Sequence, residues 1–180
     1  MNVRLSILLA TLFLIIGGAV LVNLVLRTPE SKLKEPKIWS VAMEDIVHIS
    51  ATHKETTVQY GLKDDQWVIL DGDDTPVHID TWAGTTLLLS GPRAARVISQ
   101  TVTDLSAYGL ANPSAIVVIQ ERGGQTFEFH LGIKTPDERH TYAMLVGNPR
   151  LFTLASEWGD VVTELAIEPP YPPEDESDAG

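Results

Sequence analysis

One uncharged run near the N-terminus constrains this chain more than any other feature of its sequence. The 22 residues from Leu5 to Leu26 carry no charged side chain, and Arg4 and Arg27 bound them. A helix of this length reaches about 33 Å, against roughly 30 Å for the hydrocarbon core of a bilayer. A cleavable signal peptide, the alternative, has a shorter apolar core followed by a small-residue cleavage site. We therefore predict an uncleaved single-pass anchor at residues 5–26, after a short flank at 1–4.

Small side chains gather on one face of this predicted helix. At 100° per residue, Ser6, Ala10 and Gly17 fall within about 40° of one another. Small residues let two helices approach closely in lipid, where no hydrophobic force drives their association. We predict that Ser6, Ala10 and Gly17 form a helix-packing face toward a membrane partner. The alternative is that they reflect only the usual composition of membrane spans.

The charges that flank the run do not favour an outward-facing domain. Arg4 and the terminal amine precede it, whereas four cationic residues follow it, namely Arg27, Lys32, Lys34 and Lys37. By the positive-inside rule alone, this count favours a cytoplasmic position for the rest of the chain.

Composition excludes several classes of function. The chain has 180 residues, which allows one ordinary domain with appendages. All 24 acidic residues lie beyond residue 26, together with 12 of the 13 basic ones, so this part carries a net charge of −12. Such a surface repels phosphate backbones, and we expect no nucleic-acid partner. The absence of cysteine excludes disulfides and thiolate metal sites.

The remainder divides into a linker, a folded body and a tail. Residues 27–39 contain Pro29 and Pro36 among alternating charges, which predicts an extended linker. Trp39 stands either at the membrane interface or at the start of the domain. Residues 169–180 combine four prolines with acidic residues, a composition typical of a disordered tail. The predicted domain is therefore residues 40–168.

Within this body, apolar residues alternate with a period of two in several short segments. Strands are predicted near 46–49, 57–60, 66–70, 97–98, 115–120, 126–131, 141–146 and 151–154. Helices are predicted over Thr81–Ser90, capped by Asp80, and from Ser156 to about Leu165. The order of strands and then a helix occurs twice, which suggests a duplication. We predict an α+β fold: a single transmembrane helix followed by an antiparallel-sheet domain of two strand-rich halves, each ending near a helix.

The segment "DLSAYGLANP" at 104–113 connects the two halves. Together with "DDQWVI", "LLLSGPRAARVI", "FHLG" and "HTYAMLVGNPRLFTL", it resembles the bacterial membrane-anchored family called domain of unknown function number 4340. The resemblance covers roughly residues 39–166. It implies one N-terminal span with the domain outside the cytoplasm, and some members are encoded beside transporter-type membrane components. It carries over no catalytic residues, and it decides the orientation in favour of an extracytoplasmic domain. From the motif itself, we predict that Gly109 has a positive φ.

No motif of the sequence predicts a reaction. The histidines have no metal-ligand spacing, and no nucleophile stands with a base. The carboxylates Asp71, Asp73, Asp74 and Asp80 fail the EF-hand pattern, because Pro76 and Trp82 occupy its sixth and twelfth positions. We interpret them as a solvated loop, with a weak divalent-ion site as the alternative. We predict no catalytic, cofactor-binding or metal-ligating residue.

Two function classes follow. The first is a non-catalytic accessory or scaffold subunit of a larger membrane complex, whether transporter, respiratory or photosynthetic. The second is a free-standing extracytoplasmic domain that binds a cell-wall component or a divalent ion. The bilayer and the subunits of such a complex are the predicted partners in the first case.

Overall fold

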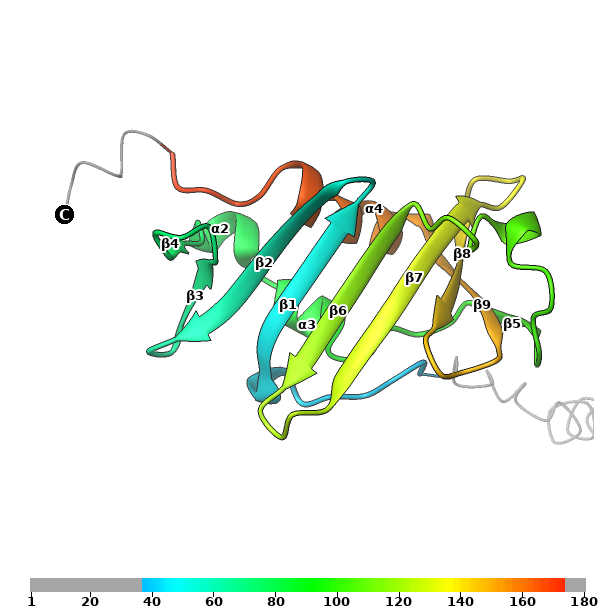
Figure 1. Cartoon of the computed structure of the whole chain (residues 1–180), viewed down its shortest axis with the longest axis horizontal. Coiled ribbons are helices and arrows are strands. Elements are labelled where there is room, and N and C mark those ends of the chain that lie inside the picture. The colour runs from blue at the N-terminus through cyan, green and yellow to red at the C-terminus, as the bar shows by residue number, and fades with distance from the viewer. Residues whose placement is uncertain (1–36, 174–180) are drawn as a thin grey trace, which may run out of the picture. The chain divides into compact units, whose positions relative to one another are not determined.

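The computed structural model describes residues 37–173 as one open antiparallel sheet with helices on one side (Figure 1). The strands are β1 (Ile46–His53), β2 (Thr56–Lys63), β3 (Gln66–Ile69), β4 (Thr75–Pro76), β5 (Arg96–Ser99), β6 (Ala115–Glu121), β7 (Thr126–Lys134), β8 (His140–Leu145) and β9 (Leu151–Ala155). Their order across the sheet is β4-β3-β2-β1-β6-β7-β8-β9-β5. The first strand of each predicted half therefore meets the other at the centre, and the two halves share one sheet.

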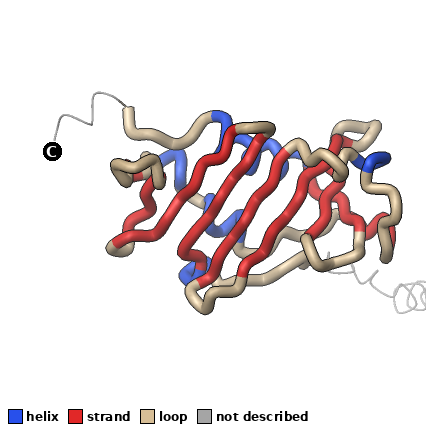
Figure 2. The backbone as a smooth tube through the Cα atoms, in the orientation of Figure 1, coloured by secondary structure: helices blue, strands red, loops and turns tan. Residues whose placement is uncertain are grey.

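The helices are short and few. They are α2 (Ile79–Trp82), α3 (Thr85–Leu89), α4 (Ser156–Ile167) and the 3-10 turns η1 (Met43–Asp45) and η2 (Ser106–Tyr108). Figure 2 shows the strands side by side with α3 and α4 behind them. No helix within residues 37–173 is long and apolar enough to cross a membrane. The predicted anchor, with Ser6, Ala10 and Gly17, lies outside the described residues.

Alternation along the central strands separates two faces of the sheet. Ile49 of β1 pairs with Tyr60 of β2 and with Ile119 of β6, and all three side chains are fully buried. Their neighbours along each strand lie on the opposite face, where His48, Ser50, Val118, Gln59 and Gln120 are only partly buried or exposed. The inner face packs on the helices, so the core lies on that side of the sheet alone.

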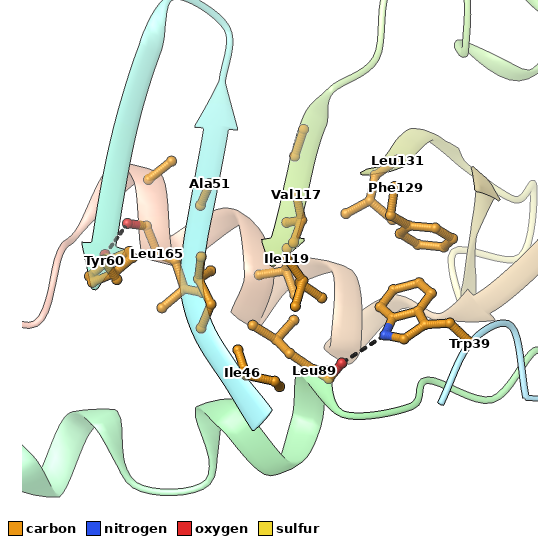
Figure 3. Close-up of a cluster of buried hydrophobic side chains, with 14 of the residues drawn as sticks. Trp39, Ile46, Ala51, Tyr60, Leu89, Val117, Ile119, Phe129, Leu131 and Leu165 are labelled. Atoms are coloured by element: carbon orange, nitrogen blue, oxygen red, sulfur yellow. Dashed lines mark hydrogen bonds between the residues drawn. The ribbon is translucent and has the colours of Figure 1, made fainter. Parts of the chain in front are cut away.

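The core contains a cluster of aromatic rings between the sheet and the helices. The Trp39 ring lies 4.9 Å from that of Phe129, which lies 5.7 Å from that of Trp158. The Trp39 indole donates a hydrogen bond of 2.9 Å to the carbonyl of Leu89, at the end of α3 (Figure 3). Trp39 therefore belongs to the folded domain, together with the buried Ile38 before it.

A second buried hydrogen bond joins the sheet to the end of α4. The hydroxyl of Tyr60 donates a hydrogen bond of 2.5 Å to the Leu165 carbonyl, within the core (Figure 3). Burial raises the pKa of this hydroxyl, because the phenolate form would lose its hydration. Beyond α4, the backbone N–H of His78 donates to the carbonyl of Pro170, whose side chain is buried.

The predicted strands are confirmed, but one helix differs from its prediction. The segment predicted as a single helix over Thr81–Ser90 forms α2 and α3, with a break at Ala83 and Gly84. Gly84 has a φ of 86°, a conformation that glycine tolerates and that a continuous helix excludes. Asp80 lies inside α2, whose N-cap is His78, so the prediction that Asp80 is a cap is wrong. The two-residue strand β4 was not predicted.

The segment 104–113 forms a compact brace against β7 and β8. The Asp104 carboxylate accepts hydrogen bonds from the Ser106 hydroxyl and from the Ser106 and Ala107 N–H groups. Gly109 ends η2 with a φ of 70°, as predicted. The ring of Tyr108 packs edge-on against that of Tyr142 in β8, with centroids 5.0 Å apart. The brace therefore fixes the position of Tyr142.

The absence of a side chain at Gly132 lets the 104–113 segment pack closely on β7, and a substitution at Gly132 tests this contact. A Cβ at Gly132 would lie 2.0 Å from the Tyr108 carbonyl oxygen, so Gly132→Ala forces backbone to move. We expect it to lower the free energy of unfolding by about 1–3 kcal/mol or more. Gly61→Ala is the control, because its Cβ would meet only the flexible Leu70 side chain at 3.2 Å. Urea unfolding of the purified chain with equal midpoints for both variants would contradict the brace.

Asp104 predicts an acid-dependent loss of stability. The hydrogen bond from the Ser106 hydroxyl, with those from the backbone, holds the pKa of Asp104 below its ordinary value of 3.8. A carboxylate whose pKa is lowered by folding stabilises the native state above its unfolded pKa, and loses that effect as the pH falls through the folded pKa. We expect Asp104→Ala to lower the melting temperature at pH 7 by a few degrees, and the difference from the wild type to shrink as the pH falls through the lowered pKa of Asp104. Thermal scans against pH, with Glu164→Ala as an exposed control, test this; a pH-independent difference would refute it.

Candidate functional site

Three features of the described residues could carry function: the uncovered face of the sheet, a concavity at one end of that face, and a cleft beside α4. The uncovered face, called here the outer face, is the side of the sheet opposite α3 and α4 (Figure 1). No described α-helix lies over it, and the 3-10 turn η2 packs on it only through the contact of Tyr108 with Tyr142. By alternation with the buried residues, its central side chains are His48, Ser50, Thr52, Ile116, Val118, Glu128, His130 and Met144.

The centre of the outer face mixes apolar and polar side chains. Ile116, Val118 and Met144 are only half-buried there. Beside them, the His130 imidazole and the Glu128 carboxylate approach within 2.7 Å. Non-obligate interfaces contain such a mixture of apolar and polar groups, as protein surfaces in general do.

A concavity of about 320 Å³ lies where the outer face reaches β5, the edge strand. Side chains of three neighbouring strands meet in it, because Tyr142 of β8 pairs with Thr153 of β9, and Thr153 pairs with Arg96 of β5. The remaining residues of the concavity are Ile98, Thr135, Pro136, Asp137 and His140. The register thus gathers three hydrogen-bond donors in one row.

One carboxylate of the concavity is engaged by its own hairpin. Asp137 accepts a hydrogen bond of 2.5 Å from the Thr135 hydroxyl and one of 3.2 Å from the Arg139 N–H. The Thr135 hydroxyl, and to a smaller degree His140, holds the pKa of Asp137 below its usual value. Asp137 therefore stays ionised and directed toward the turn between β7 and β8.

A second cleft, also about 320 Å³, lies between α4 and the β7 bulge. His53 lines it, and the Nδ1 atom of His53 is buried without a hydrogen-bond partner among the described residues. At the mouth, the Lys134 ammonium lies 3.0 Å from the Asp160 carboxylate, with both side chains about half exposed. This cleft could hold a small ligand that supplies a partner for the imidazole.

The predicted carboxylate cluster is a structured turn on the surface. Asp71 accepts hydrogen bonds from the Asp73 N–H, at 3.1 Å, and from the Thr75 hydroxyl, at 2.8 Å. The Thr75 hydroxyl is the largest cause of the lowered pKa of Asp71. Asp74 forms an ion pair with Lys63. Among residues 37–173, no group of three or more His, Asp and Glu side chains could hold a metal ion.

Sequence reasoning did not nominate the residues of either hollow. Arg96, Tyr142 and Thr153 are far apart along the chain, and only the pairing of β8, β9 and β5 brings them together. Arg96 does lie in the segment "LLLSGPRAARVI" that supports the family resemblance, but nothing in that segment marks it as a binding residue. His53 ends β1 in the structure, four residues beyond the strand that the sequence predicts near 46–49, and no neighbouring residue in the sequence marks it as a site.

Comparison with known proteins supports the family. A family profile described as "Domain of unknown function (DUF4340)" matches residues 67–166, from β3 to α4. The matched range includes the 104–113 segment and all of the concavity. Neither the curated proteins nor the solved structures include a match to this chain. Because the profile covers more than half of the chain, this protein belongs to the DUF4340 family.

Proposed function

We propose that this chain is a non-catalytic, single-pass accessory or scaffold subunit of a larger membrane complex. In this proposal, residues 5–26 anchor it, the domain lies outside the cytoplasm, and the outer face of the sheet docks on a protein subunit of the complex. The observation that carries the proposal is that the α-helices cover only one face of a nine-stranded sheet and leave the centre of the other face open.

The size of the outer face suits a protein partner. Strands lie about 4.8 Å apart and rise about 3.3 Å per residue, so the five central strands span roughly 600 Å². A standard interface buries about 800 Å² on each partner. The half-buried Ile116, Val118 and Met144 would supply the apolar centre of such an interface, and His48 and Glu128 part of its polar rim.

The anchor predicted from the sequence would favour the same role. A span bounded by Arg4 and Arg27 would hold the domain near the membrane surface, where subunits of a membrane complex present their exposed faces. The small residues Ser6, Ala10 and Gly17 would let the span pack on a partner helix.

A charged residue at the centre of the outer face should abolish docking without unfolding the domain. Val118 pairs across strands with Glu128, so Val118→Lys forms an opposite-charge pair that the sheet tolerates. At a docked interface, the buried ammonium would be costly, and we expect at least a tenfold loss of co-purified partner. The control is Leu87→Lys on α3, which is 65% exposed on the helix side. Recovery in gentle detergent is measured for both; equal recovery with equal melting temperatures would contradict docking through the outer face.

The anchor has a separate test. Gly17→Leu should reduce partner recovery several-fold, because a bulky side chain prevents close approach of the helices. Ala19→Leu, about 160° away on the helical wheel, should have little effect if that side meets lipid. If Gly17→Leu and wild type recover the same amount of partner, the small-residue face takes no part in assembly.

A second candidate function is favoured by the cleft beside α4. A free-standing ligand-binding domain would use the unpartnered Nδ1 atom of His53 and the Lys134–Asp160 pair to hold a small molecule. Gentle-detergent purification separates the two candidates. An accessory subunit migrates with stoichiometric partners, whereas a solitary binder migrates alone.

A further inference from the structure

The row Tyr142–Thr153–Arg96 has the chemistry of an oxyanion site. It lies on three adjacent strands and points to the outer face, because the neighbouring residues Ala143, Phe152 and Leu154 are buried in the core. Adjacent strands are about 4.8 Å apart, which brings the three polar groups within reach of one small group of oxygen atoms.

All three donors of the row are unengaged within the part of the chain that the structure describes. The Arg96 guanidinium makes no hydrogen bond or ion pair with residues 37–173, and neither do the hydroxyls of Tyr142 and Thr153. Thr153 is 3% exposed overall and lines the concavity, so the part of it that stays accessible faces this hollow.

The surroundings hold this row in place. The Tyr108 ring packs on the Tyr142 ring at 5.0 Å, and the β7–β8 hairpin borders the hollow through Thr135 and Asp137. Asp137, the one carboxylate of the hollow, accepts hydrogen bonds from within its own turn. The groups left to meet a ligand are the Arg96 guanidinium, the Tyr142 and Thr153 hydroxyls and the His140 imidazole, each of which can donate a hydrogen bond.

From this arrangement we propose that the concavity at β5, β8 and β9 binds the carboxylate or phosphate group of a small molecule. Arg96 binds two oxygens of the anion through its planar guanidinium. The Thr153 and Tyr142 hydroxyls donate to the same group from the floor and the side. A volume of about 320 Å³ accommodates a small metabolite and not a folded polymer. This site is additional to the docking role and does not depend on it.

Titration of the full-length purified chain with inorganic phosphate and, separately, with succinate tests the proposal. Calorimetry in a chloride buffer of constant ionic strength should show saturable binding of at least one probe. The probe that binds identifies the group, phosphate or carboxylate. Absence of saturable binding of both probes up to about 10 mM would overturn the proposal.

Matched variants locate the binding. Arg96→Gln should weaken it at least tenfold, and Thr153→Val, which keeps the shape of the side chain, about tenfold. Arg122→Gln removes the same charge from the exposed turn between β6 and β7 and should leave the affinity within twofold. Equal loss in Arg96→Gln and Arg122→Gln would show a general charge effect, and an unchanged affinity in Arg96→Gln would show another site; either result refutes the assignment.

Discussion

Two indole N–H groups hold the helix layer of this domain to one face of its sheet. The Trp39 indole donates to the Leu89 carbonyl at 2.9 Å, and the Trp158 indole donates to the Leu88 carbonyl at 3.3 Å. The last carbonyls of a helix have no partner within the helix, so α3 would otherwise end with unsatisfied acceptors in an apolar layer. The two bonds join the N-terminal segment and α4 to α3 above Phe129. Because all these elements lie on the inner face, the outer face is left free.

The sheet has an approximate two-fold arrangement that explains its width. β1 and β6 pair antiparallel at the centre, and each begins a run of strands that proceeds outward. Each half also contains a similar contact between a helix tryptophan and a ring of the sheet. In the first half, the ring of Trp82 in α2 lies 4.8 Å from that of Tyr60 in β2; in the second, the ring of Trp158 in α4 lies 5.7 Å from that of Phe129 in β7. This is what the duplication suggested by the sequence would produce. The departure is β5, which pairs outside β9 and creates the hollow that contains Arg96.

Features of this fold that depend on consecutive residues could be predicted from the sequence, whereas features that depend on contacts between distant residues could not. Strands such as Ala115–Glu121 were predictable because the alternation of inward and outward side chains is visible in consecutive residues of the sequence. The break of the 81–90 helix at Gly84 was not, because a single glycine inside a helical pattern is often tolerated. The Tyr142–Thr153–Arg96 row depends on the register of three strands, which the sequence does not state. The 104–113 segment was recognisable by its residues, whereas its contact with Tyr142 was not.

The proposal that the outer face docks on a partner is tested most directly by methionine oxidation in native membranes. Met144 is half-buried on the outer face, and Met43 is 47% exposed in η1. Hydroxyl-radical footprinting would compare the oxidation rate of each methionine in native membranes with that in the purified chain. We expect Met144 to be protected several-fold in membranes and Met43 to react at the same rate in both preparations. Equal oxidation of Met144 in the two preparations would contradict docking through the outer face.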